Sequence, residues 1–190
     1  VTGVQTCALP ISLVPTQIGE KLRVIATSTG RGQAAEAIAR QYPNSEVTLW
    51  YIDQFHQQRA IQHAQWKATV PTESHSSLVS GSNHQTTPPI QTVIEIAPPS
   101  NLNVVCLPDL PEESVDLALV PLPHQGEQEL SRDYLQQAFD RLKVGGLLVA
   151  AVDNPTDKWL HDQLKTYEKS VRVREYAESR AYCIRKTKPL

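Results

Sequence analysis

The stretch "TSTGRGQAA", Thr27 to Ala35, lies between the apolar run "LRVIA" and the alanine-rich stretch "AEAIARQ". The first flank has the composition of a buried strand, and the second has apolar residues at helical spacing. Gly30 and Gly32 therefore fall at a strand-to-helix transition, where glycine lets the backbone pass very close to another group. This pattern predicts the opening unit of a nucleotide-type α/β fold, and it leaves open which cofactor the turn accepts.

The alternation of strands and helices continues along the chain. Apolar and β-branched runs predict strands at 21–28, 45–53, 92–96, 101–109, 114–123, 146–154, 171–178 and 180–186. Helical spacing predicts helices at 33–42, 54–67, 129–146 and 155–169. We expect Gly145-Gly146 to stop the third helix and Asn154, before Pro155, to cap the fourth. This order predicts an α/β fold, a Rossmann-like doubly wound sheet that is mainly parallel, with an antiparallel C-terminal hairpin.

The 190 residues suffice for one domain with a sizeable core, and none of them is methionine. A natural chain nearly always carries its initiator, so we expect a fragment. The first eleven residues, "VTGVQTCALPI", resemble the translation of a sequencing adapter, so 1–11 is expected to be an artefact and 12–190 the domain.

Residues 68–91 are rich in Ser, Thr and Pro, which predicts a mobile insertion. Its His75 and His84 lack further ligands at metal-binding spacing, so no metal site is predicted.

Composition limits the class of protein. The net charge of −2 gives no global field that would steer nucleic acid or a membrane surface. No apolar run approaches the length of a membrane span, which predicts a soluble, cytoplasmic protein. Cys106 and Cys183 stand in apolar, strand-like runs without a C-x-x-C pair, a pattern typical of reduced, buried thiols.

Three classes of nucleotide site share a glycine turn of this kind. A P-loop needs Lys-Ser or Lys-Thr after its glycines, and neither follows here, so that class is excluded. A NAD(P)-binding oxidoreductase is an alternative, because Gly30-x-Gly32-x-x-Ala35 fits the G-x-G-x-x-A variant and Asp53 can accept a ribose hydroxyl. No obvious hydride-transfer constellation accompanies the turn. A turn that only packs a helix onto a sheet is the structural alternative.

The later part of the chain favours the third class. The turn "LKVGG", 142–146, precedes a buried strand, and the order of elements from 21 to 186 resembles the class I S-adenosylmethionine-dependent methyltransferases. The resemblance implies a seven-stranded sheet of the methyltransferase type. It also implies S-adenosyl-L-methionine as the cofactor, lying over the turn that contains Ser28, Gly30 and Gly32. It implies that Asp53 binds the ribose hydroxyls and that Asp109 lies near the adenine amino group. The structural alternatives are a strand-end cap for Asp53 and a turn residue for Asp109.

The sequence departs from that family at two places. Ala26 replaces the acid that begins the glycine motif, and Ser28 replaces its first glycine, so weaker cofactor binding is expected. Where the amine methyltransferases have [DNS]-P-P-[FYW], this chain has "VPLPH", 120–124, which lacks the acceptor side chain and the stacking ring. His124 is a weak candidate for a general base, and a solvated loop residue is the simpler reading. The catalytic residue is otherwise unknown.

The stretch "AAVDNPTDKWLHDQLKTYEKSVRVREYAESRAYCIRKTKPL", 150–190, resembles the small-subunit ribosomal RNA guanine-N2 methyltransferase family. Those proteins have two tandem methyltransferase-like domains, a degenerate first one and a catalytic second one. The resemblance implies that this chain is the first domain, with ribosomal RNA and a second methyltransferase domain as partners. Two functions remain open for this chain: a methyltransferase domain, and a non-catalytic module that positions RNA.

Basic residues are concentrated in the C-terminal quarter of the chain. They could contact phosphates or simply cover a solvated face: Lys165, Lys169, Arg172, Arg174, Arg180, Arg185, Lys186 and Lys188.

Overall fold

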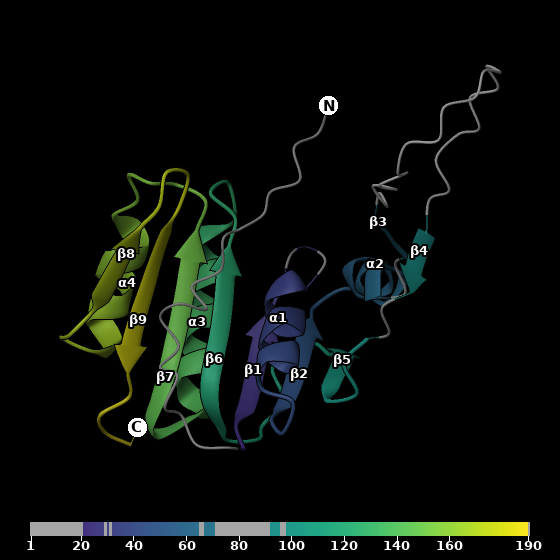
Figure 1. Cartoon of the computed structure of the whole chain (residues 1–190). Helices are drawn as coiled ribbons and strands as arrows, with labels where there is room; N and C mark the ends of the chain where they lie inside the picture. The colour runs from purple at the N-terminus through teal and green to yellow at the C-terminus, as the bar shows by residue number, and fades with distance from the viewer. Residues whose placement is uncertain are drawn as a thin grey trace, which may run out of the picture.

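The computed structural model describes residues 21–28, 30, 32–64, 67–70, 92–95 and 98–189 (Figure 1). The suspected adapter, 1–11, and most of the predicted insertion, with His75 and His84, lie outside the described residues. The predictions for these two segments therefore stay predictions.

One seven-stranded sheet organises the described part of the chain, in the order β5-β2-β1-β6-β7-β9-β8. Its strands are β1 (Arg23–Thr27), β2 (Glu46–Tyr51), β5 (Leu102–Cys106), β6 (Val115–Leu122), β7 (Leu142–Val152), β8 (Arg172–Glu175) and β9 (Arg180–Arg185). The first five of these pair in parallel, and β9 pairs antiparallel with both β7 and β8. The predicted fold, a mainly parallel doubly wound sheet with an antiparallel C-terminal hairpin, is confirmed.

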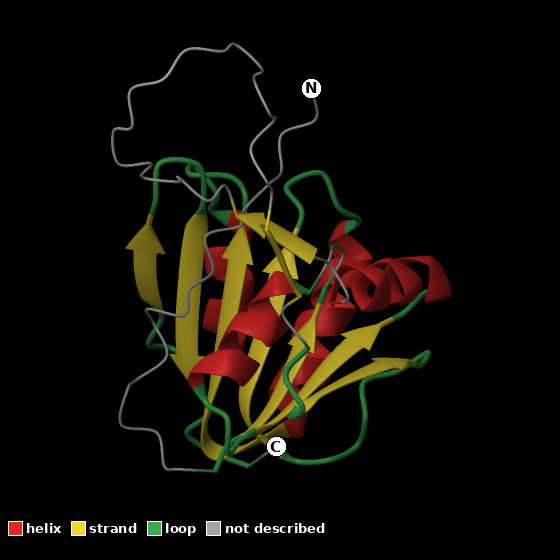
Figure 2. Cartoon of the chain, turned by 45° about the vertical axis from the view of Figure 1, so that its right-hand side comes forward, coloured by secondary structure: helices red, strands yellow, loops and turns green. Residues whose placement is uncertain are grey.

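Helices cover both faces of the sheet (Figures 1 and 2). Helix α1 (Gln33–Gln41) packs on one face, where alternate apolar residues of β1 and β2 such as Val24 and Leu49 form one core cluster. Helices α3 (Gln128–Arg141) and α4 (Trp159–Tyr167) pack on the other face, over residues such as Ile25. Burial on both faces explains why the central strands read as continuous apolar runs in the sequence.

The "LKVGG" turn corrects the predicted end of the third helix. Helix α3 ends at Arg141, and β7 begins at the next residue, so Gly145 and Gly146 belong to the strand region and do not stop the helix. The pairing of β7 with β6 breaks between Leu142 and Leu147, and the intervening loop contains Gly145 at φ 89°. Backbone hydrogen bonds to Lys186 hold this loop, at 2.8 and 3.0 Å. A contact with β9, forty residues away, thus replaces the local helix stop.

The start of the fourth helix also differs from the prediction. Asn154 accepts hydrogen bonds from the backbone and hydroxyl groups of Thr156 and so forms a local turn before the helix. Helix α4 begins at Trp159, and the carboxylate of Asp157 accepts a hydrogen bond from the backbone N–H of Leu160 in its first turn, at 3.1 Å. Asn154 is therefore not the N-cap.

A small hairpin lies apart from the main sheet. Helix α2 (Gln54–Ala64) is followed by β3 (Lys67–Val70), which pairs antiparallel with β4 (Thr92–Glu95). This pairing takes 67 from the predicted helix and 68–70 from the predicted insertion. The predicted strand at 92–96 is present as β4, but it pairs only with β3.

Two further expectations are resolved in the described residues. Cys106 and Cys183 are both free thiols, but only Cys183 is buried, and Cys106 is half-buried. Burial raises the pKa of the Cys183 thiol above its ordinary value. In the described part of the chain, no helix is long and apolar enough to cross a membrane.

Candidate cofactor site

The carboxyl ends of the parallel strands converge at one edge of the sheet. The chain runs outward from β1 to β2 and β5, and then returns to β6 on the other side of β1. The ends of β1 and β6 therefore form a topological switch point, which is where ligands bind in open α/β sheets. The glycine turn follows β1 at this point.

The two glycines of the turn have different roles. Gly32 has a φ of 74°, and a Cβ atom there would come within 2.2 Å of Leu49 and 3.1 Å of the hydroxyl of Tyr51. Its carbonyl accepts the first hydrogen bond of α1, from the N–H of Glu36 at 3.1 Å. Gly30 is exposed, and a Cβ atom there would have only the Ser28 Oγ within 4 Å, at 3.9 Å. Packing thus requires a glycine at position 32, whereas at position 30 the described residues leave room for a larger residue.

A hydrogen bond from Tyr51 supports the glycine turn. Its buried side chain donates a hydrogen bond to the Gly30 carbonyl at 3.0 Å, and the Ser28 Oγ accepts one from the Gly30 N–H, also at 3.0 Å. Burial raises the pKa of Tyr51 to about 12, so the hydroxyl keeps its proton at neutral pH. Ser28, at the family's first glycine, therefore orders the turn through its side chain.

Replacing Tyr51 by phenylalanine should remove this support. We expect Tyr51→Phe to lower the free energy of unfolding by about 0.5–1.5 kcal/mol, because the Gly30 carbonyl loses its donor. Urea unfolding measures the change. Tyr42→Phe is the control, because the Tyr42 hydroxyl has only a 3.4 Å contact with its neighbour Gln41. An unchanged unfolding midpoint for Tyr51→Phe would show that the hydroxyl does not support the turn.

Asp53 follows β2 and caps helix α2. Its carboxylate accepts the backbone N–H of His56 at 2.9 Å, and its other oxygen lies 2.6 Å from Nδ1 of the His56 ring. These hydrogen bonds hold the pKa of Asp53 below its ordinary value. The side chain is 45% exposed, so the ionised carboxylate has acceptor sites left for a ligand. The predicted structural role is therefore present, and the predicted ribose role remains available.

Two exposed apolar residues stand at the same strand ends as Asp53, and the sequence analysis did not single them out. Ile52 and Leu107 follow β2 and β5 and are 46% and 42% exposed. The Leu107 N–H donates to the Tyr51 carbonyl at 3.2 Å, which ties the two strand ends together. A hydrophobic residue directly after a buried parallel strand, where the chain should leave the core, is the signal that could have found them.

Asp109 lies two residues beyond Leu107 and is exposed. Its Oδ1 is 3.4 Å from the side-chain amide of Gln137 on α3, whose carbonyl oxygen accepts the N–H of Leu110 at 2.9 Å. The loop after β5 is therefore fastened to α3, and Asp109 stands at the edge where β2 and β5 end.

Two buried polar atoms at this edge have no hydrogen-bond partner among the described residues, Thr27 Oγ1 and Trp50 Nε1. Thr27 and Trp50 are partners in the β1–β2 ladder, 2% and 1% exposed, and Trp50 meets Tyr134 of α3 edge-to-face at 5.1 Å. Burial and the negative charge of Asp53 raise the pKa of Tyr134. Unpaired buried polar atoms are uncommon in folded proteins, so this corner has unused hydrogen-bonding capacity.

A methyl acceptor would be expected at the end of β6, but the residues there offer few polar side chains. Pro121 and Leu122 are the last residues of the strand, and Pro123 and His124 follow it. His124 is exposed, and its backbone N–H donates to Asp153 at the end of β7. Ala26, at the family's acid position, is fully buried and contributes no charge.

The basic residues of the C-terminal quarter do not form one surface. Lys186 is 4% exposed and donates to the carbonyls of Phe139 and Asp140 at the end of α3. Arg180 binds the Asp157 carbonyl and the Glu175 carboxylate. The prediction that Lys186 could contact phosphates is therefore wrong, because this cation is committed to the core. The exposed members are Lys165, Lys169, Arg172, Arg174, Arg185 and Lys188.

The oxidoreductase alternative finds no support in these positions. One Tyr-x-x-x-Lys spacing is present, with Tyr182 in β9 and Lys186 directly after that strand. The Tyr182 hydroxyl is buried against Asp157 at 3.1–3.2 Å, and Lys186 caps α3, so neither side chain faces the glycine turn. Within the described ranges, no group of three or more His, Cys, Asp or Glu side chains could hold a metal ion.

Comparison with known proteins gives likenesses in fold. No protein-family model matches the sequence, and no curated protein matches it. Among solved structures, the putative rRNA-methylase from Clostridium thermocellum is 12% identical, with a TM-score of 0.57 over 89% of this chain and 88% of that one. An RNA methyltransferase from Salinibacter ruber, in complex with S-adenosyl-L-homocysteine, is 10% identical, with a TM-score of 0.53 over 89% and 83%.

A third similar structure is the T. thermophilus 16S rRNA N2 methyltransferase RsmC, in complex with AdoMet and guanosine. It is 16% identical, with a TM-score of 0.55, and the match covers 87% of this chain and 37% of that one. The chain therefore has the Rossmann-like fold of these methyltransferases.

Proposed function

We propose that this chain is an S-adenosyl-L-methionine-binding domain of the class I methyltransferase type, related to the ribosomal RNA guanine-N2 methyltransferases. The observation that carries the proposal is the open glycine turn at the switch point, with the ionised carboxylate of Asp53 and the apolar pair Ile52 and Leu107 beside it. A nucleoside needs these three features: close backbone approach, an acceptor for ribose hydroxyls, and apolar contact for a purine.

The residues fit the nucleoside half of this cofactor. The backbone at Gly30 would lie under the ribose and the methionine chain, since among the described residues only the Ser28 Oγ comes within 4 Å of a Cβ atom placed there. Asp53 would accept the ribose hydroxyls, Asp109 would lie near the adenine amino group, and Ile52 and Leu107 would contact the ring. When bound, the cofactor supplies an activated methyl group.

The residues fit the amino end of the cofactor poorly. Ala26 is buried and neutral where the family has a carboxylate for the cofactor's amino end, and Ser28 uses its hydroxyl within the turn. Each lost hydrogen bond to a charged group costs about 1.5–3 kcal/mol, so two losses weaken a micromolar site to about millimolar. At the end of β6, Pro121 and Pro123 offer no acceptor for an amine. We therefore propose that the domain binds the cofactor weakly and transfers no methyl group by itself.

The partners in this proposal are ribosomal RNA and a second, catalytic methyltransferase domain. Similarity in fold to rRNA methylases supports RNA as the class of partner. The non-catalytic role would be to position RNA or to pack against the catalytic domain.

A titration of the 15N-labelled protein with S-adenosyl-L-homocysteine tests cofactor binding in the millimolar range. We expect shifts of the Gly30 and Gly32 amide signals, and a dissociation constant at least tenfold weaker for Asp53→Asn, because a charge-assisted hydrogen bond is lost. Asp162→Asn is the control, since Asp162 is an exposed carboxylate on α4. Absence of saturable shifts at these glycines, or tighter binding of NADH than of the homocysteine analogue, would contradict the proposal.

Tritium transfer from labelled S-adenosyl-L-methionine to naked small-subunit rRNA tests the second half. We expect no incorporation above background for the wild-type chain. Label recovered in guanine would show that the domain is an enzyme, and loss of that label in His124→Ala would then identify His124 as its base.

A further inference from the structure

Helix α2 carries an exposed cluster of an aromatic ring, an imidazole and a guanidinium: Phe55, His56 and Arg59. Phe55 is 63% exposed, the most exposed large hydrophobic side chain among the described residues. The Arg59 Cζ lies 5.5 Å from the centre of the Phe55 ring, and the His56 ring meets that ring edge-on at 5.6 Å. A cation over an aromatic face is a favourable contact, so the cluster is arranged before any partner binds.

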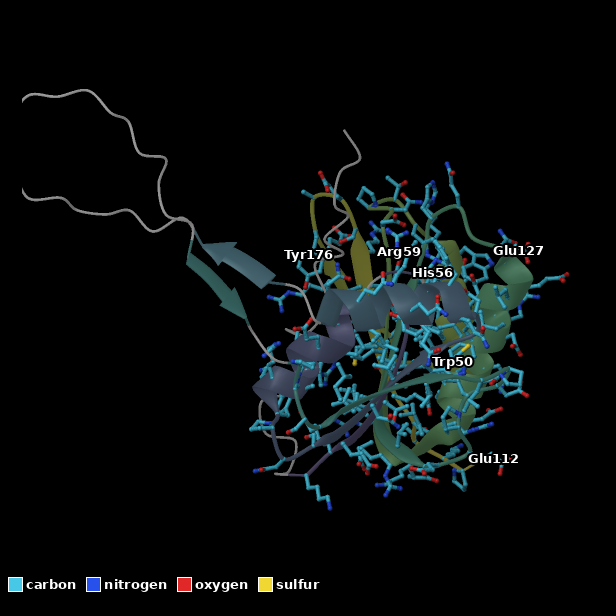
Figure 3. All side chains as sticks on the ribbon, turned by 90° about the vertical axis from the view of Figure 1, so that its right-hand side faces the viewer. Trp50, His56, Arg59, Glu112, Glu127 and Tyr176 are labelled. Carbon is cyan, nitrogen blue, oxygen red and sulfur yellow. The ribbon has the colours of Figure 1, made fainter. Side chains whose placement is uncertain are left out.

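The cluster lies directly beside the candidate cofactor site. The Nδ1 of His56 is 2.6 Å from the carboxylate of Asp53, so the first turn of α2 is fastened to the end of β2. The side-chain amide of Gln57 donates to the Val104 carbonyl of β5 at 3.5 Å. Figure 3 shows His56 and Arg59 on α2, with Trp50 below this helix in the view.

The charge of this helix differs from that of the other helices. No Asp or Glu occurs from 54 to 72, although the chain contains 20 acidic residues. Helix α3, by contrast, carries Glu129, Asp133 and Asp140. Within the described residues, no carboxylate forms an ion pair with Arg59. The exposed face of α2 therefore offers the guanidinium of Arg59 to an anionic partner, and the nearby carboxylate of Asp53 is hydrogen-bonded to His56.

We infer that this face of α2 binds unpaired RNA, with Phe55 stacking on a base and Arg59 contacting the phosphate backbone. An exposed ring combined with a cation is how proteins hold single strands, because every base has a face that can stack. The exposed amides of Gln58 and Gln62 on the same helix add hydrogen-bonding groups for base edges. A duplex hides its base faces, so it would use only the cation. The inference rests on the proposed function in one respect: the bound strand would lie next to the cofactor.

Fluorescence anisotropy of the full chain with a labelled, unstructured 12-nucleotide RNA tests the stacking contact without cofactor. We expect about tenfold weaker binding for Phe55→Ala, nearly wild-type binding for Phe55→Trp, and a loss for Phe55→Leu as large as for alanine. Val173→Ala is the matched control, because Val173 is 43% exposed on the distant edge strand β8. A duplex of the same sequence should bind more weakly than the single strand.

The salt dependence of binding tests the phosphate contact. For Arg59→Gln we expect the slope of log affinity against log salt to become shallower by about 0.7, the value for one phosphate of a single strand. Lys21→Gln, which removes an exposed cation just before β1, at the opposite end of the strands, should leave the slope unchanged. Circular dichroism melting of each variant separates a loss of binding from a loss of folding.

The outcomes separate this inference from the proposed function. If the RNA results are as expected and the homocysteine analogue does not bind, the RNA-binding face stands and the cofactor proposal fails. If Phe55→Leu binds RNA as tightly as the wild type, or duplex and single strand bind equally, the stacking inference is overturned. It is also overturned if light scattering shows that Phe55→Ala abolishes self-association and leaves RNA affinity unchanged, because the face would then bind a second copy of this chain.

Discussion

The substitution Gly32→Ala is expected to lower the free energy of unfolding by about 2–5 kcal/mol. The residue has a φ of 74°, in the left-handed region, where a Cβ atom costs about 1–2 kcal/mol. The added atom would also lie 2.2 Å from Leu49 Cδ2, inside a core where Leu49 is 1% exposed. Overpacking of this kind costs about 1–3 kcal/mol, since neither side chain nor backbone can move away freely. Urea unfolding followed by circular dichroism measures the change.

Gly30→Ala is the matched control, two residues away in the same turn. Among the described residues, the nearest neighbour of the added atom is the Ser28 Oγ at 3.9 Å, so stability should change by less than about 0.5 kcal/mol. The same substitution should weaken cofactor binding, because the methyl group enters the space that the proposed ligand uses. Equal loss of stability in both variants would show that the two glycines do not differ in the way described.

The second large effect is expected for Lys186→Met, at about 2–4 kcal/mol. The buried ammonium donates to the carbonyls of Phe139 and Asp140 at 3.0 and 3.1 Å and lies 5.2 Å from the Phe139 ring centre. Methionine fills a similar volume but leaves these carbonyls at the end of α3 without a donor, and it removes a cation from the negative end of the helix dipole. Chemical unfolding measures the loss.

Lys188→Met is the control for Lys186→Met. Lys188 is exposed two residues later in the chain, so its replacement should change stability by less than about 0.5 kcal/mol. If Lys186→Met unfolds at the wild-type midpoint, the buried cap does not stabilise the fold. RNA affinity provides a second readout, since a folded Lys186→Met variant should bind single-stranded RNA as the wild type does.

Local patterns in the sequence were enough to predict most of the strands and helices. The strands at Arg23–Thr27 and Glu46–Tyr51 lie inside the predicted ranges 21–28 and 45–53, and the glycine turn stands where the change of periodicity indicated it. These features depend on neighbours in the chain: β-branched runs favour strands, and apolar residues three or four apart favour helices. The antiparallel hairpin at the C-terminus could be predicted from the sequence for the same reason.

Two of the predictions that were wrong involve partners distant in sequence. The "LKVGG" segment has the pattern of a helix stop, but backbone hydrogen bonds between this segment and Lys186 hold it in the region of β7. The basic run near the C-terminus suggested an exposed surface, yet one of its lysines fills the space under α3. Each of Ile52 and Leu107 is an apolar residue just after a predicted strand core, but only the pairing of β2 with β5 brings the two to one edge of the sheet.

The sequence by itself determined the order of elements, the class of fold and the place of the glycine turn, because hydrophobic periodicity and glycine chemistry act over a few residues. Only the tertiary structure decided which glycine is required by packing, that Asp53 is held by His56 while half its surface stays open, and which cation is buried. Such properties depend on the register of strands and on helices packed across the sheet. A contact between residues tens of positions apart leaves no periodic trace in either segment.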